Sequence, residues 1–262
     1  MLKMPPIKKG RPYIGITGFR TPDQVEQLFK VFKALKPLQS DRLFHVGVMT
    51  SRKMLRGLQT EFADAFPAVA EIAPIFRSDL TYNCLHYTDR GFDPDLCRNL
   101  CDAMQAGGMG LDALQLDLTW PNPGDVANAL HISRKIPDVI LQVGNAAFER
   151  IADNPDLLVE RLFEYKTFIH RVLLDKSMGK GKTMDPEFLK PFLRAIRKAY
   201  PHLLLVVAGG LGTDTAYLIE QFVEEFPEIS FDVEAGVRKS RSNMDPIDLN
   251  LCSRYLAEHS KF

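Results

Sequence analysis

The chain has 262 residues, of which 45% are hydrophobic and 25% charged, so it is long and apolar enough to form a globular protein with a sizeable core. Thirty-three basic residues balance 33 acidic ones, so no global positive field favours a nucleic acid or an anionic membrane as partner. No segment approaches the ~20 apolar residues of a membrane span, and Pro5 and Pro6 interrupt the place of a signal-peptide core. We therefore expect a cytoplasmic protein.

The cysteines give no sign of a disulfide framework. They are scattered at Cys84, Cys97, Cys101 and Cys252. Cys97 and Cys101 have the i, i+4 spacing of a helix rather than the CxxC spacing of a zinc knuckle or a redox pair. We expect all four to be reduced thiols, as is usual inside cells.

Short aliphatic or β-branched runs recur along the chain, each bounded by glycine, proline or polar residues, and they predict strands. The eight runs are residues 13–17, 43–49, 69–76, 113–118, 139–143, 168–174, 203–208 and 229–233. Helical periodicity with proline or aspartate start signals follows residues 21, 95, 123 and 185, and a last helix is predicted over residues 245–258.

Alternating strands and helices predict parallel strands joined by crossovers, and eight such units in this length predict one (β/α)8 barrel. The domain covers residues 1–262, with residues 1–12 as an extension before the first strand. An open, doubly wound sheet is the alternative.

The longest predicted connection runs over residues 77–95, between the third strand and its helix. Connections longer than ~12 residues are usually functional or disordered, and the aromatic residues Tyr82 and Tyr87 favour order here. His86 can titrate near neutral pH, although a histidine in a loop more often only packs or hydrogen-bonds.

Glycine-rich turns follow the last two predicted strands. After the seventh come Gly209, Gly210, Leu211, Gly212 and Thr213, and after the eighth come Ala235 and Gly236. The loops after strands seven and eight of a barrel often bind phosphate, because bare backbone brings amides close to an anion and a helix N-terminus attracts it. We predict an anion site at these turns; ordinary tight turns are the alternative.

Five segments in chain order read YIGITGFRTPDQV, ALQLD, VLLDKSMGKGKTMDP, LLLVVAGGLGTD and ISFDVEAGVRKS. This series resembles the motif series of phosphoribosylanthranilate isomerase, a tryptophan-pathway barrel, most strongly over residues 171–239. The resemblance implies a phosphosugar site and an Amadori rearrangement, in which an aminoaldose opens and becomes an aminoketose.

In that family a cysteine at the end of strand one is the general base and an aspartate at the end of strand six is the general acid. Asp175 matches the acid, whereas Thr17 replaces the cysteine, and a hydroxyl acts as a base only if another group takes its proton. Asp117 stands where the family usually has histidine and could share acid–base work with Asp175. Structural roles stay open: Asp175 could cap a helix or pair with Arg171 or Lys176, and Asp117 could fix a loop.

Charged residues surround the predicted phosphate loops. Glu234 replaces a serine of the family's loop, and a carboxylate repels phosphate unless a cation such as Arg238 intervenes. Arg20 and Arg52, after strands one and two, can hold a carboxylate or phosphate through paired hydrogen bonds.

The segment GKGKT at residues 179–183 is not a nucleotide-binding P-loop, because Lys176 stands where that motif needs glycine. It fits the family's mobile loop after strand six, which covers the substrate; a solvated loop is equally compatible.

No metal-ligand spacing and no Ser-His-Asp pattern is present, so we expect no cofactor and a metal-independent site. The expected partner is a small phosphorylated or anionic ligand, bound by a monomer or homodimer. The replaced cysteine predicts a divergent isomerase or lyase without authentic phosphoribosylanthranilate isomerase activity. A barrel that binds a ligand as a sensor or scaffold, with its catalysis lapsed, is the alternative.

Overall fold

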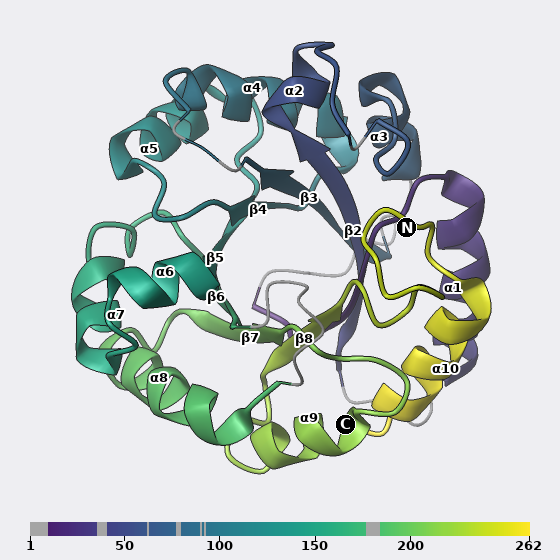
Figure 1. The fold of residues 1–262 in the computed structure, drawn as a ribbon, viewed down its shortest axis with the longest axis vertical. Helices are drawn as coiled ribbons and strands as arrows, with labels where there is room; N and C mark the ends of the chain where they lie inside the picture. Colours follow the sequence, from purple (N-terminus) through teal and green to yellow (C-terminus); the bar gives the residue numbers. More distant parts are fainter. Residues whose placement is uncertain are drawn as a thin grey trace, which may run out of the picture.

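Eight parallel strands close into a barrel in chain order, from β1 to β8, in the computed structural model, which describes residues 10–35, 41–61, 63–76, 80–89, 91, 93–176 and 184–262 (Figure 1). The strands are β1 Tyr13–Thr17, β2 Leu43–Ser51, β3 Thr81–Thr88, β4 Ala113–Asp117, β5 Asp138–Gly144, β6 Arg171–Asp175, β7 Leu204–Ala208 and β8 Ser230–Val233. The predicted (β/α)8 barrel is confirmed, and the open-sheet alternative is wrong because β1 pairs with both β2 and β8.

Helices form a ring around the strands. They are α1 Pro22–Leu35, α2 Arg52–Leu55, α3 Val69–Ile75, α4 Leu96–Gly107, α5 Pro123–Ile132, α6 Asn145–Arg150, α7 Pro155–Leu162, α8 Pro186–Ala199, α9 Ala216–Val223 and α10 Leu249–His259. The start signal at Asp185 is confirmed, since its carboxylate accepts a hydrogen bond from the Phe188 amide at 3.1 Å. The last helix begins at Leu249 rather than at residue 245, because Asp248 caps it.

The predicted third strand at residues 69–76 is wrong: this segment forms α3, and the true third strand is β3, inside the supposed long loop. In α3 the buried residues Ile72 and Ile75 lie three positions apart, and Glu71 accepts a hydrogen bond from the Ala68 amide at 3.1 Å. β3 was not predicted because polar residues interrupt its sequence, TYNCLHYT. Seven of its eight residues are nevertheless buried.

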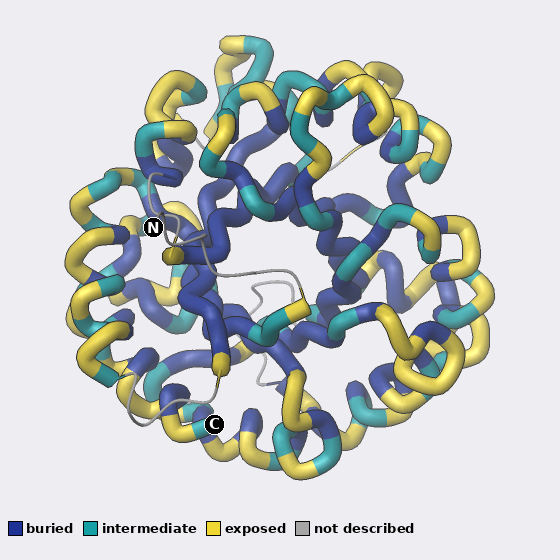
Figure 2. Tube along the Cα trace, turned by 180° about the vertical axis from the view of Figure 1, so that it is seen from behind, coloured by how far each residue is buried: buried dark blue, intermediate teal, exposed yellow. Residues whose placement is uncertain are grey.

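Burial follows the two-layer plan of the fold. The strands are almost wholly buried, and exposed residues collect on the outer helices and loops (Figure 2). One large apolar cluster fills the space between strands and helices, and a smaller one lies inside the barrel. Among the described helices, none combines the length and the apolar character needed to cross a membrane.

A buried arginine fills the end of the barrel where the strands begin. Arg171 is 0% exposed, and its three guanidinium nitrogens donate to the Tyr82 hydroxyl at 3.1 Å, the Ser230 hydroxyl at 3.5 Å and the Arg11 carbonyl at 2.8 Å. The guanidinium also lies 5.2 Å from the centroid of the Tyr13 ring. We call Tyr13, Tyr82, Arg171 and Ser230 the arginine layer.

Candidate active site

A cavity of about 1250 Å³ opens at the carboxyl ends of the strands, the end at which TIM barrels build their sites. Of the residues predicted for the site, eight line it: Thr17, Asp117, Asp175, Gly209, Gly210, Leu211, Ala235 and Gly236. The structure thus brings the predicted catalytic residues and part of both glycine turns to one place.

Carboxyl groups from three strands meet in this cavity. Asp117 ends β4, Asp175 ends β6, and Asp232 and Glu234 lie on β8 and just beyond it. Burial raises the pKa of Glu234 to about 7; Arg238 opposes that rise, and the charges of Asp117 and Asp175 add to it. The cavity therefore holds carboxyl groups in different electrostatic environments, an arrangement that can divide acid and base roles.

Asp232 is the partner of Thr17. The Thr17 hydroxyl donates to Asp232 Oδ2 at 2.8 Å and lies 3.4 Å from Nε2 of His86. Burial raises the pKa of Asp232 to about 8, partly offset by the Thr17 hydrogen bond, while the charge of Glu234 raises it further. In its ionised form, which predominates above about pH 8, Asp232 can take a proton from Thr17.

The two residues suggested as partners for a structural role of Asp175 each have a contact elsewhere. Arg171 belongs to the arginine layer at the other end of β6, and Lys176 forms an ion pair with Asp153. Asp117 has a structural contact, since its Oδ2 accepts from the Thr88 hydroxyl at 3.0 Å.

The two glycine turns contact each other directly. Gly212 and Gly236 form an isolated parallel bridge, and the Gly212 amide donates to the Thr215 hydroxyl at 2.8 Å. A Cβ atom on Gly236 would lie 1.9 Å from the Leu211 carbonyl oxygen, so the close approach of the two turns requires glycine there. This packing explains part of the glycine pattern, and the anion site stays a prediction.

The predicted cations are held by the protein itself and do not line the cavity, and neither do Gly212 and Thr213. Arg20 donates to the Met244 carbonyl at 3.0 Å, and Arg52 forms an ion pair with Asp89 at 2.9 Å. Arg238 donates to the carbonyls of Thr17, Glu234, Asn243 and Asp245, and its guanidinium lies 3.7 Å from the Glu234 carboxylate. Arg238 therefore ties the loop after β8 to the end of β1.

Other charged residues line the cavity in their place. Its described lining contains three cations, Lys53, Arg150 and Arg241, against eight carboxyl side chains. The acidic excess disfavours a polyanionic ligand. The segment predicted to cover the substrate, residues 179–183, lies outside the described residues.

Sequence reasoning missed Asp232 and underrated His86. Both point into the barrel, and their signal is alternation: residues 82, 84 and 86 of β3, and residues 230, 232 and 234 from β8 into its loop, fall on one face. Asp232 was not predicted because it lies within the predicted strand at residues 229–233 rather than at its end.

No protein-family model matches the chain, and no curated protein matches it. Solved structures do. An aldolase named QR15 is 8% identical over 93% of this chain and 95% of its own, with a TM-score of 0.52. A phosphonopyruvate hydrolase is 15% identical over 86% and 75%, with a TM-score of 0.51. A Chromobacterium violaceum protein named for spore coat polysaccharide biosynthesis is 12% identical over 95% and 74%, with a TM-score of 0.57.

All three neighbours are TIM-barrel proteins, and at these identities the likeness shows the barrel fold alone. None of the three is named as a phosphoribosylanthranilate isomerase, so that closer resemblance stays a prediction.

Proposed function

We propose that the chain is an enzyme that transfers protons within a small sugar-like substrate, as a divergent isomerase or lyase of the phosphoribosylanthranilate isomerase type, without that family's own activity. The observation that carries the proposal is the Thr17–Asp232 hydrogen bond of 2.8 Å in a cavity that Asp175 and Asp117 also line. A base and an acid from different strands then face one substrate.

Asp232 supplies what the replacement of cysteine by Thr17 removes. A threonine hydroxyl alone is not a base, but the carboxylate that accepts its hydrogen bond can take a proton from the substrate directly or through that hydroxyl. Asp175, at the end of β6, then acts as the acid that protonates the opposite side of the substrate.

The lining limits the substrate. A substrate rich in hydroxyl groups suits this cavity, because its hydroxyls can donate hydrogen bonds to the many carboxylates. A substrate with several phosphates would be repelled by them. A single anionic group of the substrate fits best at the glycine turns, where Gly209, Gly210 and Gly236 line the cavity; Arg241 is also part of that lining.

A ligand-binding barrel without catalysis is the second candidate. It is favoured by Glu234, whose carboxylate sits 3.7 Å from Arg238 in the predicted phosphate loop, where it would compete with a phosphate for the cation. Binding without turnover is the behaviour that this candidate predicts.

Deuterium incorporation tests the proposal without knowledge of the natural substrate. A panel of aldoses, ketoses and their monophosphates, together with phosphoribosylanthranilate, is incubated with the protein in deuterated water and followed by NMR. We expect exchange with at least one sugar, reduced about 10²–10⁴-fold by Asp232→Asn and by Asp175→Asn. Asp156→Asn, at an exposed position on α7, is the matched control and should keep the wild-type rate.

Binding of a panel member without any exchange would favour the sensor alternative. Robust turnover of phosphoribosylanthranilate by the wild type would contradict the expected loss of the family's activity. Exchange that survives Asp232→Asn would refute the role given to Asp232.

A further inference from the structure

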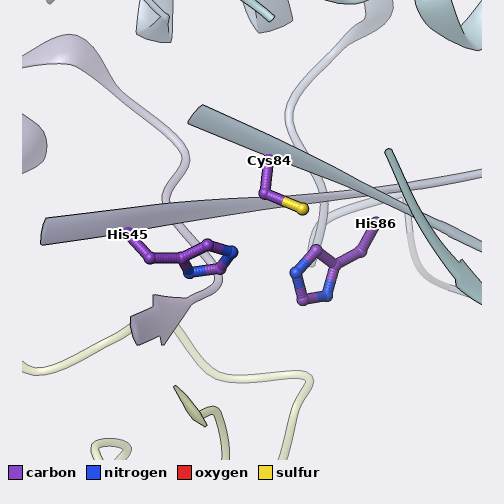
Figure 3. Close-up of side chains that lie close together, drawn as sticks. All are labelled: His45, Cys84 and His86. Atoms are coloured by element: carbon purple, nitrogen blue, oxygen red, sulfur yellow. The ribbon is translucent and has the colours of Figure 1, made fainter. Parts of the chain in front are cut away.

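Three side chains with metal-ligating atoms meet inside the barrel, between the arginine layer and the cavity. His45 comes from β2, and Cys84 and His86 come from β3, where residues two apart face the same side. One nitrogen or sulfur atom of each lies within 4.8 Å of those of the others. Figure 3 shows both imidazole rings and the Cys84 sulfur turned toward a common space. We call these residues the histidine–cysteine cluster.

The cluster contains polar atoms that the protein leaves unpaired. His45 is 0% exposed, and neither of its ring nitrogens has a hydrogen-bond partner among the described residues. Buried polar groups in proteins are nearly always hydrogen-bonded, so an exception calls for an explanation such as an ion. Ring stacking on Tyr13, at 4.5 Å between centroids, fixes the plane of the ring but pairs neither nitrogen.

A carboxylate lies behind His45. Asp232 Oδ1, which has no hydrogen-bond partner within the described ranges, is 3.9 Å from His45 Nδ1. Gly15 pairs with both residues in the sheet, and a Cβ atom there would lie 2.5 Å from Asp232 Oδ1 and 2.9 Å from His45 Nδ1. The absence of a side chain at Gly15 is what lets the carboxylate and the imidazole approach each other.

We propose that His45, Cys84 and His86 bind a zinc-type divalent metal ion at the floor of the cavity. Two imidazoles with one thiolate are a donor set that suits Zn²⁺ and is too soft for Mg²⁺ or Ca²⁺. Asp232 stands where metal-bound histidines usually find the carboxylate that orients them.

Charge also fits this site. Zinc binds the thiolate form of cysteine, so binding would release the Cys84 proton to solvent and leave a negative charge beside the metal. His86 lines the cavity, whereas His45 and Cys84 lie beneath it, and three protein ligands leave a fourth position for water or substrate. The metal would bring a cation to a cavity whose described lining is acidic. This inference does not depend on the acid–base proposal above.

The test measures metal and its ligands separately. The full-length protein, purified after growth with zinc, is analysed for metal content by mass spectrometry and then titrated with Co²⁺ after removal of zinc. We expect a single metal ion per chain and a Co²⁺–thiolate charge-transfer band. Cys84→Ala should abolish the band, and His86→Gln should weaken metal binding by about 100-fold or more, since losing even an orienting partner costs 10–100-fold.

The other cysteines and histidines provide matched controls. Cys252→Ala removes another buried thiol, the Cys97→Ala/Cys101→Ala variant removes the pair on α4, and His259→Gln removes another buried histidine. All three variants should retain one bound metal ion per chain and the Co²⁺–thiolate charge-transfer band. A band that survives Cys84→Ala, a band lost in either cysteine control, or wild-type protein without stoichiometric metal would overturn the proposal. Should Cys84→Ala not fold, the wild-type band and the two cysteine controls decide the matter alone.

Discussion

Two of the buried polar side chains inside the barrel, Arg171 and His45, lie at successive levels and differ in their hydrogen bonding. In the arginine layer, all three guanidinium nitrogens of Arg171 donate hydrogen bonds. In the histidine–cysteine cluster, one level nearer the cavity, His45 is equally buried and makes none to the part of the chain that the structure describes. Burying a polar group is tolerable when its bonds are made and costly when they are not. We therefore interpret the arginine layer as structural and the histidine–cysteine cluster as a candidate binding site.

Removing the paired arginine should have the largest effect on stability. Arg171→Ala leaves a cavity and strips partners from buried groups that include the Arg11 carbonyl, so we expect a loss of about 3–5 kcal/mol in the free energy of unfolding. Urea unfolding measures it. Arg194→Ala, which breaks an exposed ion pair with Glu225, is the control and should cost no more than about 1 kcal/mol. An equal, small effect of both substitutions would remove the distinction between the two levels.

Supplying a metal should turn the unpaired cluster into a paired one. At a free Zn²⁺ concentration ~100 times the dissociation constant, binding to the folded state should add about 2.7 kcal/mol to the free energy of unfolding. Thermal unfolding with Zn²⁺ and with a chelator measures the gain, which Cys84→Ala should abolish and Cys252→Ala should retain. A gain of equal size in both variants would place the metal elsewhere.

Sequence reasoning recovered β7 because its sequence, LLVVA, is an uninterrupted aliphatic run. There the run of aliphatic residues reflects burial on both faces. β3 carries Tyr82, Cys84 and His86 on its inward face, so it lacks such a run, and its sequence looked like an ordered loop. The nearby α3 has an apolar sequence because one face of the helix is buried. That apolar run led to the wrong prediction of a strand.

The site was partly predictable for a related reason. Thr17, Asp117 and Asp175 each follow an apolar run, and a polar residue at the end of a strand points to the mouth of a barrel. Asp232 lies within a run rather than at its end, and His45 sits between apolar neighbours on β2. Only the pairing of β1 with both β2 and β8 brings these last two residues together, and that register cannot be read from one sequence.

A third buried histidine offers an intermediate case. His259 is 0% exposed, its Nδ1 donates to the Tyr255 carbonyl at 2.9 Å, and burial lowers its pKa to about 4. The unfolded chain, with a pKa near 6.5, binds the proton first, so the folded state loses stability as the pH falls from about 6.5 toward 4. Between pH 7 and pH 5 this residue should account for about 2 kcal/mol of lost stability, by the linkage of pKa to free energy.

His259→Gln isolates that contribution, because the other buried histidines remain in both proteins. Urea unfolding at pH 7 and pH 5 should show a drop in the variant that is smaller by about 2 kcal/mol. Equal drops in the two proteins would mean that His259 is protonated in the folded state.

Replacing the unpaired histidine should have the smallest effect, and its sign separates the two levels most sharply. In the metal-free protein, His45→Phe keeps a ring to stack on Tyr13 and removes two buried nitrogens that have no hydrogen-bond partner among the described residues. Because an unmade buried hydrogen bond carries a desolvation penalty, we expect no loss, or a gain of up to about 1 kcal/mol, in urea unfolding with a chelator present. His259→Phe is the matched control and should destabilise, since it breaks the bond to the Tyr255 carbonyl. The same His45→Phe protein should gain nothing from Zn²⁺, so stability and metal response would move in opposite directions. A loss of more than about 2 kcal/mol on His45→Phe would show that His45 is paired in solution like Arg171, and the contrast between the levels would fail.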